Sequence, residues 1–199
     1  LATQEFGLPI DGWIDLSTGI NPTSYPNTEI SSQTLRILPT PGNIEHLLDA
    51  ARKFYHIVDN THIIAAPGTQ SILQNLPIFF PDRKITILSP TYSEHRNTWE
   101  QAGNIVVPVD NIGALSNGDI AVLVNPNNPD GRSYKKAELI ALSTNVELLI
   151  IDEAFCDNSP NLSMAPHLFK QNILILRSLG KFFGLAGLRL GFAIGPIKS

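Results

Sequence analysis

The sequence predicts an α/β fold in which a mainly parallel sheet is flanked by helices. Short apolar runs alternate with stretches of helical spacing across residues 44–199. Such alternation requires crossover connections, which make neighbouring strands parallel. Polar or glycine-containing segments follow most of the apolar runs, as expected at the ligand-binding carboxyl edge of an open sheet. The composition agrees, because 43% of the residues are hydrophobic and suffice for a sizeable core.

The N-terminal part of the chain has a different character. Residues 1–43 are rich in proline and glycine and are predicted to form an extended arm with little regular structure. From Asn43, a plausible N-cap, apolar residues recur at helical spacing, which predicts a helix that ends near His56. The sequence thus divides into an arm, residues 1–43, and one domain, residues 44–199.

The alternating pattern assigns the elements of this domain in order. Strands are predicted at 62–66, 84–88, 105–109, 120–124, 148–151 and 173–176. Helices are predicted to begin near Thr69, Ser93 and Lys135. Because the carboxyl ends of parallel strands meet at one edge, the segments that follow them are expected to lie together there. These segments are Pro67–Gln70, Ser89–Tyr92, Asn125–Gly131, Asp152–Glu153 and Ser178–Lys181.

Lys181 is the strongest candidate for a catalytic residue. It follows an apolar strand and lies in a turn with Gly180 and Gly184. Apolar neighbours favour a neutral amine, a nucleophile whose typical use is a Schiff base with an aldehyde. A phosphate-binding P-loop is the competing interpretation. It fails because the positions that need glycine and Ser or Thr hold Ile175 and Phe182.

An aldehyde cofactor with a phosphate and a pyridine ring, pyridoxal 5'-phosphate, would give each of these segments a role. The start of a helix at Gly68, Thr69 and Gln70 suits a phosphate. Ser178 can add a hydroxyl donor, and Arg189 can pair with the same phosphate.

The other polar residues at this edge suit the pyridine ring. Asp152 follows a buried strand, so its carboxylate should stay ionised only beside a cation such as a protonated pyridine nitrogen. Tyr92 offers a flat face to the ring, and the Asn128 amide can donate to the phenolic oxygen. His95 is expected to contact Asp152 if it is not merely structural.

Four motifs together resemble those of a known family. They are DLSTGINP at 15–22, NPNNPDGR at 125–132, DEAF at 152–155 and LGKFFGLAGLRLGF at 179–192. In this combination they resemble the class I/II aminotransferases of the fold-type I pyridoxal-phosphate enzymes. Within that family they look most like the cobalamin-biosynthesis branch of threonine-phosphate decarboxylase and its CobC-type relatives.

The resemblance implies specific roles for individual residues. Lys181, Asp152 and Tyr92 are implied to be catalytic, as the Schiff-base lysine, the pyridine partner and the stacking ring. The implied cofactor-binding set is Gly68, Thr69, Gln70, Tyr92, Asn128, Asp152, Ser178, Lys181 and Arg189. The implied substrate-binding set is Gly19, Ile20, Asn21 and Asn128.

The resemblance also implies a fold and an activity. The fold is the large domain of a pyridoxal-phosphate-dependent transferase, and the small C-terminal domain of the family is expected to follow Ser199 and to be missing here. The implied activity is decarboxylation of a phosphorylated threonine in a homodimer, and transamination of the histidinol-phosphate type is the alternative. A cytoplasmic location is expected on separate grounds, since no stretch resembles a signal peptide or a membrane span. Two departures bear on the choice. Phe155 stands where many aminotransferases have tyrosine, and Leu38 precedes Pro39 where histidinol-phosphate enzymes have tyrosine.

Other function classes are less well supported by the composition. A net charge of −4 without a basic stripe argues against nucleic acid as a partner. No apolar run approaches a membrane span of about 18 residues, and the histidines lack metal-ligand spacing. Two readings of another class stay open. In the first, residues 147–153 resemble the Walker B strand of a nucleotide-hydrolysing domain. In the second, the chain is a truncated, non-catalytic member of the family.

Overall fold

The computed structural model describes residues 2–9, 11–14, 18–26, 30–59, 61–168 and 172–196. The first three residues of the DLSTGINP motif, Asp15–Ser17, lie outside these ranges. No helix within them has the length and apolar character needed to cross a bilayer.

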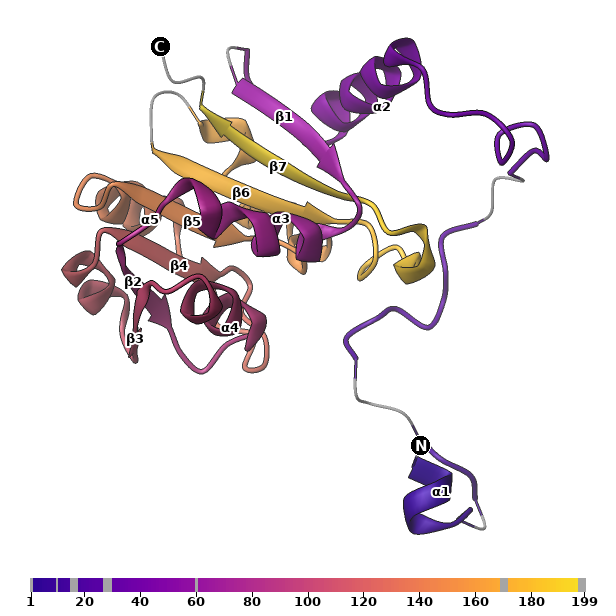
Figure 1. The fold of residues 1–199 in the computed structure, drawn as a ribbon, viewed down its shortest axis with the longest axis horizontal. Helices are drawn as coiled ribbons and strands as arrows, with labels where there is room; N and C mark the ends of the chain where they lie inside the picture. The colour runs from indigo at the N-terminus through magenta and orange to yellow at the C-terminus, as the bar shows by residue number, and fades with distance from the viewer. Residues whose placement is uncertain are drawn as a thin grey trace.

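A seven-stranded sheet forms the centre of the molecule (Figure 1). In spatial order its strands are β1, β7, β6, β5, β4, β2 and β3. Their bounds are β1 Thr61–Ala66, β2 Lys84–Leu88, β3 Ile105–Val109, β4 Ile120–Val124, β5 Leu148–Asp152, β6 Ile173–Ser178 and β7 Gly191–Pro196. The predicted mainly parallel sheet is confirmed, because the strands from β3 to β6 pair in parallel.

Strand β7 is the exception in direction, and the sequence pattern did not predict it as a strand. It is antiparallel to both of its neighbours, β6 and β1. Two reversals in succession restore the original direction, so β1 points the same way as β6. The carboxyl end of β1 therefore lies at the same edge of the sheet as those of the other parallel strands.

Helices cover both faces of the sheet. The α-helices are α1 Ala2–Phe6, α2 Pro41–Phe54, α3 Thr69–Asn75, α4 Glu94–Gln101 and α5 Lys136–Ser143. Short 3-10 helices are η1 Leu76–Phe79, η2 Ile112–Asn117, η3 Cys156–Asn158, η4 Pro160–Leu162, η5 Ala165–His167 and η6 Ala186–Leu188. Helices α3 and α4 pack on one face, and α2, α5 and η5 pack on the other.

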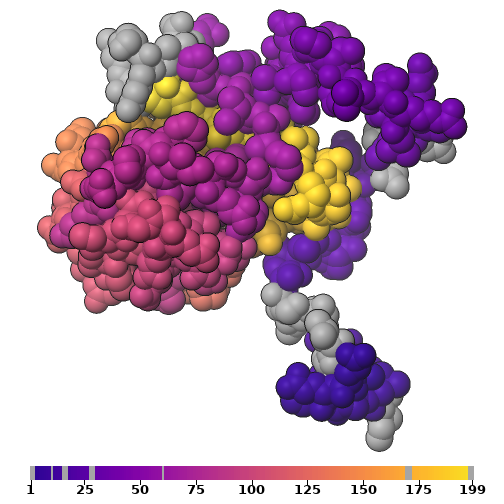
Figure 2. Space-filling model, in the orientation of Figure 1, coloured from indigo at the N-terminus to yellow at the C-terminus, as the bar shows by residue number. Residues whose placement is uncertain are grey.

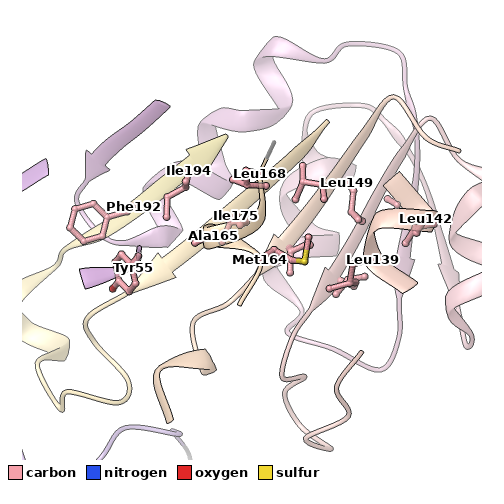
Figure 3. Close-up of a cluster of buried hydrophobic side chains, with 14 of the residues drawn as sticks. Tyr55, Leu139, Leu142, Leu149, Met164, Ala165, Leu168, Ile175, Phe192 and Ile194 are labelled. Atoms are coloured by element: carbon pink, nitrogen blue, oxygen red, sulfur yellow. The ribbon is translucent and has the colours of Figure 1, made fainter. Parts of the chain in front are cut away.

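Alternation along the strands divides the core into two clusters. In β4, Ala121 and Leu123 join the cluster with α2 and α5, whereas Ile120 and Val122 join the cluster with α3 and α4. Figure 3 shows the first cluster, in which side chains from α2, α5 and η5 meet those of the central strands. Burial on both faces explains why the strands read as continuous apolar runs.

The N-terminal segment is largely exposed. It contains the short helix α1, which stands apart from the body of the molecule in Figure 2. Helix α2 begins at Pro41, earlier than predicted, because Thr40 rather than Asn43 is its N-cap. Thr40 Oγ1 accepts a hydrogen bond from Asn43 N, and Asn43 Oδ1 accepts one from Thr40 N, which forms a capping box. The division into domains after residue 43 stays a prediction.

A buried ionic cluster joins Arg177 of β6 to Glu153, which follows β5, and to Asp157 of η3. Arg177 Nη1 lies 2.9 Å from Glu153 Oε2, and Arg177 Nη2 also pairs with Asp157. The Arg177 guanidinium sits 4.3 Å from the centroid of the Tyr55 ring. Burial raises the pKa of Glu153, and the neighbouring Arg177 charge counteracts that rise.

Replacing Arg177 should destabilise the fold. Arg177→Met leaves Glu153 and Asp157 buried without a cation, so the free energy of unfolding should fall by about 3 to 5 kcal/mol in urea denaturation. Arg96→Met, which removes the exposed pair with Glu100, is the control and should cost less than about 1 kcal/mol.

The loss should also depend on pH. Since burial raises the pKa of both acids in the folded state, protonating them favours folding once Arg177 is gone. The deficit of Arg177→Met should therefore shrink as the pH falls from about 8 towards about 5. A loss of stability below about 1 kcal/mol at neutral pH would contradict a structural role for the cluster.

Candidate functional site

A cavity of about 190 Å³ opens at the carboxyl edge of the parallel strands. Every residue expected to bind a cofactor lines it: Gly68, Thr69, Gln70, Tyr92, Asn128, Asp152, Ser178, Lys181 and Arg189. These residues follow β1, β2, β4, β5 and β6, or lie at the ends of β5 and β6. The common direction of those strands brings them to one place, although they are far apart in the sequence.

Asp152 forms the buried end of this cavity. It is 5% exposed, and its Oδ2 lies 3.0 Å from Nε2 of the fully buried His95 on α4. Its Oδ1 accepts a hydrogen bond from Ala154 N at 2.9 Å. With a proton on Nε2, His95 donates this hydrogen bond to the carboxylate. The expected contact between these two residues is present, and it orients the carboxylate.

Gly68, Ser178 and Arg189 line the same cavity. Gly68 has a φ of 78°, a conformation that favours glycine, and a Cβ there would lie 2.8 Å from Arg189 Nη2. The guanidinium therefore lies close to the backbone at the start of α3. Arg189 itself adopts a left-handed conformation with a φ of 51°. The Ser178 hydroxyl accepts a hydrogen bond from Gly180 N at 3.2 Å.

Tyr92 takes part in a series of side-chain hydrogen bonds that the sequence did not predict. Its hydroxyl donates to Gln70 Oε1 at 3.3 Å, and Gln70 Nε2 donates to Glu94 Oε2 at 2.6 Å. Burial raises the pKa of Tyr92, and the negative charges of Glu94 and Asp152 add to the effect. The Gln70 side chain is thus engaged with Tyr92 and Glu94. The sequence gives no sign of the contact between Gln70 and Glu94, because Glu94 lies on a different helix and belongs to no motif.

A larger cleft of about 760 Å³ adjoins the cavity. All four residues expected to contact substrate line it, Gly19, Ile20, Asn21 and Asn128. Ile20, Asn128, Phe155 and Lys181 line both spaces, so Lys181 lies where they meet. Sequence reasoning did not identify the polar side chains on the far wall of the cleft, Ser133, Asn158 and Ser159.

The Phe155 ring lies near both Gly19 of the arm and the Lys181 amine. A Cβ at Gly19 would lie 2.8 Å from Phe155 Cε1, so the arm backbone packs directly on the ring. Lys181 Nζ lies 5.6 Å from the centroid of the same ring. Lys181 itself is only half-buried, less than its apolar neighbours suggested. The Phe183 ring packs on Tyr25 and Phe54, with ring centroids 5.9 Å and 5.8 Å away.

The Walker B interpretation finds no support at this edge. Glu153 is fully buried, where it accepts hydrogen bonds from Ser163 Oγ and Met164 N and pairs with Arg177. It therefore has no free oxygen to offer a nucleotide or an attacking water. Within the described ranges no group of His, Cys, Asp and Glu residues is arranged to hold a metal ion.

The residues of the cavity fit pyridoxal 5'-phosphate. The Thr69 and Ser178 hydroxyls and the Arg189 guanidinium suit a phosphate. Asp152, in contact with His95, suits a protonated ring nitrogen. Tyr92 supplies an aromatic face, and Lys181 supplies the amine that an aldehyde requires.

Comparisons with known proteins agree with this chemistry. A family model described as "Aminotransferase class I and II" matches residues 11–198. A threonine-phosphate decarboxylase of Sinorhizobium sp. is 40% identical over 200 residues, which cover 97% of this chain and 60% of that protein. The chain thus spans less than two thirds of the length of this relative.

Solved structures show the same fold. The histidinol-phosphate aminotransferase of Clostridium acetobutylicum has a TM-score of 0.74 at 24% identity, and the match covers 90% of this chain and 59% of that one. The histidinol-phosphate aminotransferase of Sinorhizobium meliloti, solved in complex with pyridoxal-5'-phosphate, has a TM-score of 0.67 at 22% identity. That match covers 76% of this chain and 46% of the other chain. The chain therefore belongs to the class I and II aminotransferase family, whose members depend on pyridoxal phosphate.

Proposed function

We propose that this protein is a pyridoxal-phosphate-dependent lyase that decarboxylates an amino-acid phosphate, a phosphorylated threonine, in cobalamin biosynthesis. The observation that carries the proposal is a single cavity shared by Lys181, Asp152 and Arg189. The identity of 40% with a threonine-phosphate decarboxylase supports the choice of substrate. Because the chain spans about 60% of that relative, the activity is proposed for the whole protein.

The residues of the cavity divide the binding of the cofactor between them. Arg189, with the hydroxyls of Thr69 and Ser178 and the backbone of Gly68 and Gln70, holds the phosphate. Asp152 would pair with the ring nitrogen, and His95 contacts the carboxylate. Tyr92 would supply a face for the ring. Asn128 would donate to the phenolic oxygen, since Phe155 has no hydroxyl to do so.

Lys181 carries out the proton transfers. When bound, pyridoxal 5'-phosphate supplies an electron sink for the electron pair released at the substrate Cα. In decarboxylation the bond between Cα and the carboxylate breaks, CO₂ leaves, and Lys181 Nζ donates the proton that replaces it on Cα. The position of Lys181 between the two spaces lets its amine face both the cofactor residues and the substrate cleft.

Transamination of the histidinol-phosphate type is the second candidate. It is favoured by the fold shared with histidinol-phosphate aminotransferases. In that reaction Lys181 Nζ would remove the Cα proton instead of donating one. The presence of Phe155 where many aminotransferases have tyrosine speaks for the decarboxylase.

The protein is further proposed to act as a homodimer in the cytoplasm. Several large apolar side chains of the N-terminal segment are exposed, which supports their burial against a second copy: Ile30, Leu35, Ile37 and Leu38. The one cysteine, Cys156, is free and buried, which agrees with a compartment that keeps thiols reduced.

Lys181→Ala should abolish covalent attachment of the cofactor. Wild-type protein incubated with pyridoxal phosphate and then reduced with borohydride should gain one cofactor mass, and peptide mapping should locate it at Lys181. The exposed Lys135→Ala is the matched control and should behave as wild type. Cofactor mass retained at another lysine in Lys181→Ala would contradict the assignment.

Asp152→Asn should remove the negative charge while preserving the shape of the side chain. Turnover should fall on the order of 100-fold, because the ring nitrogen loses its charged partner. Asp110→Asn, at an exposed aspartate after β3, serves as the control. Turnover of Asp152→Asn within about 3-fold of wild type would show that the carboxylate does not act on the cofactor.

The reaction itself distinguishes the candidates. With L-threonine O-3-phosphate, the protein should release CO₂ without any keto acid being present. Transfer of the amino group to a keto acid without CO₂ release would favour the aminotransferase. Cofactor attachment without turnover of either kind would favour a non-catalytic member of the family.

A further inference from the structure

The turn that carries Lys181 is bound along its length by the N-terminal segment. We call residues 181–184 the lysine turn and residues 21–25 the strap. Each of the four consecutive carbonyls of the lysine turn accepts a hydrogen bond from the strap. In Figure 1 the lysine turn belongs to the loop between β6 and β7, more than 150 residues away from the strap in the sequence.

Asn21 binds the first half of the turn. Its backbone N donates to Lys181 O at 3.0 Å, and its Nδ2 donates to Phe182 O at 2.9 Å. Its Oδ1 accepts a hydrogen bond from Thr23 N at 2.9 Å, which fixes the orientation of the amide. Both polar atoms of the side chain are therefore used within the protein, although Asn21 lines the substrate cleft.

Ser24 and Tyr25 bind the second half. Tyr25 N donates to Phe183 O at 2.8 Å, and Ser24 Oγ donates to Gly184 O at 3.1 Å. The Tyr25 ring packs edge-on against Phe183, which also packs against Phe54 of α2 and Phe182. These contacts add apolar packing to the hydrogen bonds.

Gly184 shows that the close approach is built into the turn. Its φ is 65°, a conformation that glycine adopts at little cost. A Cβ at this position would lie 2.7 Å from Asn21 O and 2.9 Å from Ser24 Cα. Any larger residue would therefore push the strap away from the turn.

We infer that Asn21 is a positioning residue for Lys181: the strap orients the carbonyls of the lysine turn and so sets where the amine lies between the two cavities. The inference rests on the proposed role of Lys181. Hydrogen bonds from a second segment hold a catalytic group more accurately than an isolated turn can. It differs from the role that the family resemblance implies, in which Asn21 contacts substrate.

The test measures how fast Lys181 captures the cofactor in the absence of substrate. Pyridoxal phosphate is added at a fixed concentration, samples are reduced with borohydride at intervals, and the modified fraction at Lys181 is measured by peptide mass. Asn21→Ala should slow capture about 5-fold, because it removes the side-chain hydrogen bond to Phe182 O and the one from Thr23 N that orients the amide. Gly184→Ala, which displaces the strap without altering it, should slow capture at least as much. Thr23→Val is the matched control, since its side chain makes no hydrogen bond to the turn among those described, and should match wild type.

This assay distinguishes positioning of Lys181 by Asn21 from binding of substrate by Asn21. Capture at the wild-type rate in Asn21→Ala, together with a raised KM and an unchanged kcat, would overturn the inference and return Asn21 to substrate binding. Slower capture in Asn21→Ala and Gly184→Ala, but not in Thr23→Val, supports positioning, because no substrate is present in that assay.

A second readout needs no cofactor and keeps the inference testable if wild-type protein captures none. Hydrogen exchange of the cofactor-free protein should speed up in Asn21→Ala and Gly184→Ala, both in the strap and in the peptide that contains Lys181. If wild-type protein captures no cofactor but exchange speeds up in both variants, the proposed function is refuted. The inference that the strap holds the lysine turn then still stands. Unchanged exchange around Lys181 in both variants would overturn the inference itself.

Discussion

The site depends on the shared direction of the strands from β1 to β6. Their carboxyl ends meet at one edge, and the residues that follow them line one cavity. Strand β7 makes this possible for β1, since two antiparallel pairings in succession leave β1 parallel to β6. Gly191, the first residue of β7, lets this strand pack closely on the start of α3, because a Cβ there would lie 2.6 Å from Thr69 N.

Alternation of side chains separates function from stability at the ends of β5 and β6. Asp152 and Ser178 face the cavity, whereas their sequence neighbours Glu153 and Arg177 face the opposite side and form a buried ion pair. The same two strands thus present reactive groups on one face and a structural cluster on the other. This arrangement also explains why an Asp-Glu pair after an apolar strand does not form a nucleotide site here.

The N-terminal segment supports the lysine turn, although its composition predicts only an irregular arm. Proline and glycine make it irregular, yet Gly19 packs on Phe155 and residues 21–25 cap the carbonyls of the lysine turn. One continuous stretch of chain therefore lines the larger cleft and contacts the lysine turn.

The sequence by itself determined the parallel strands and the candidate residues of the cavity, because both leave local signals. Buried strands are continuous apolar runs, and Lys181, Asp152 and Asn128 stand in motifs directly after them. The sequence did not reveal β7, the early start of α2 at Thr40, or the chain from Tyr92 through Gln70 to Glu94. Only the tertiary structure decided these, since strand direction and hydrogen bonds between distant segments depend on which elements the fold brings together. The use of Asn21 belongs to the same class, because its partners lie about 160 residues further along the chain.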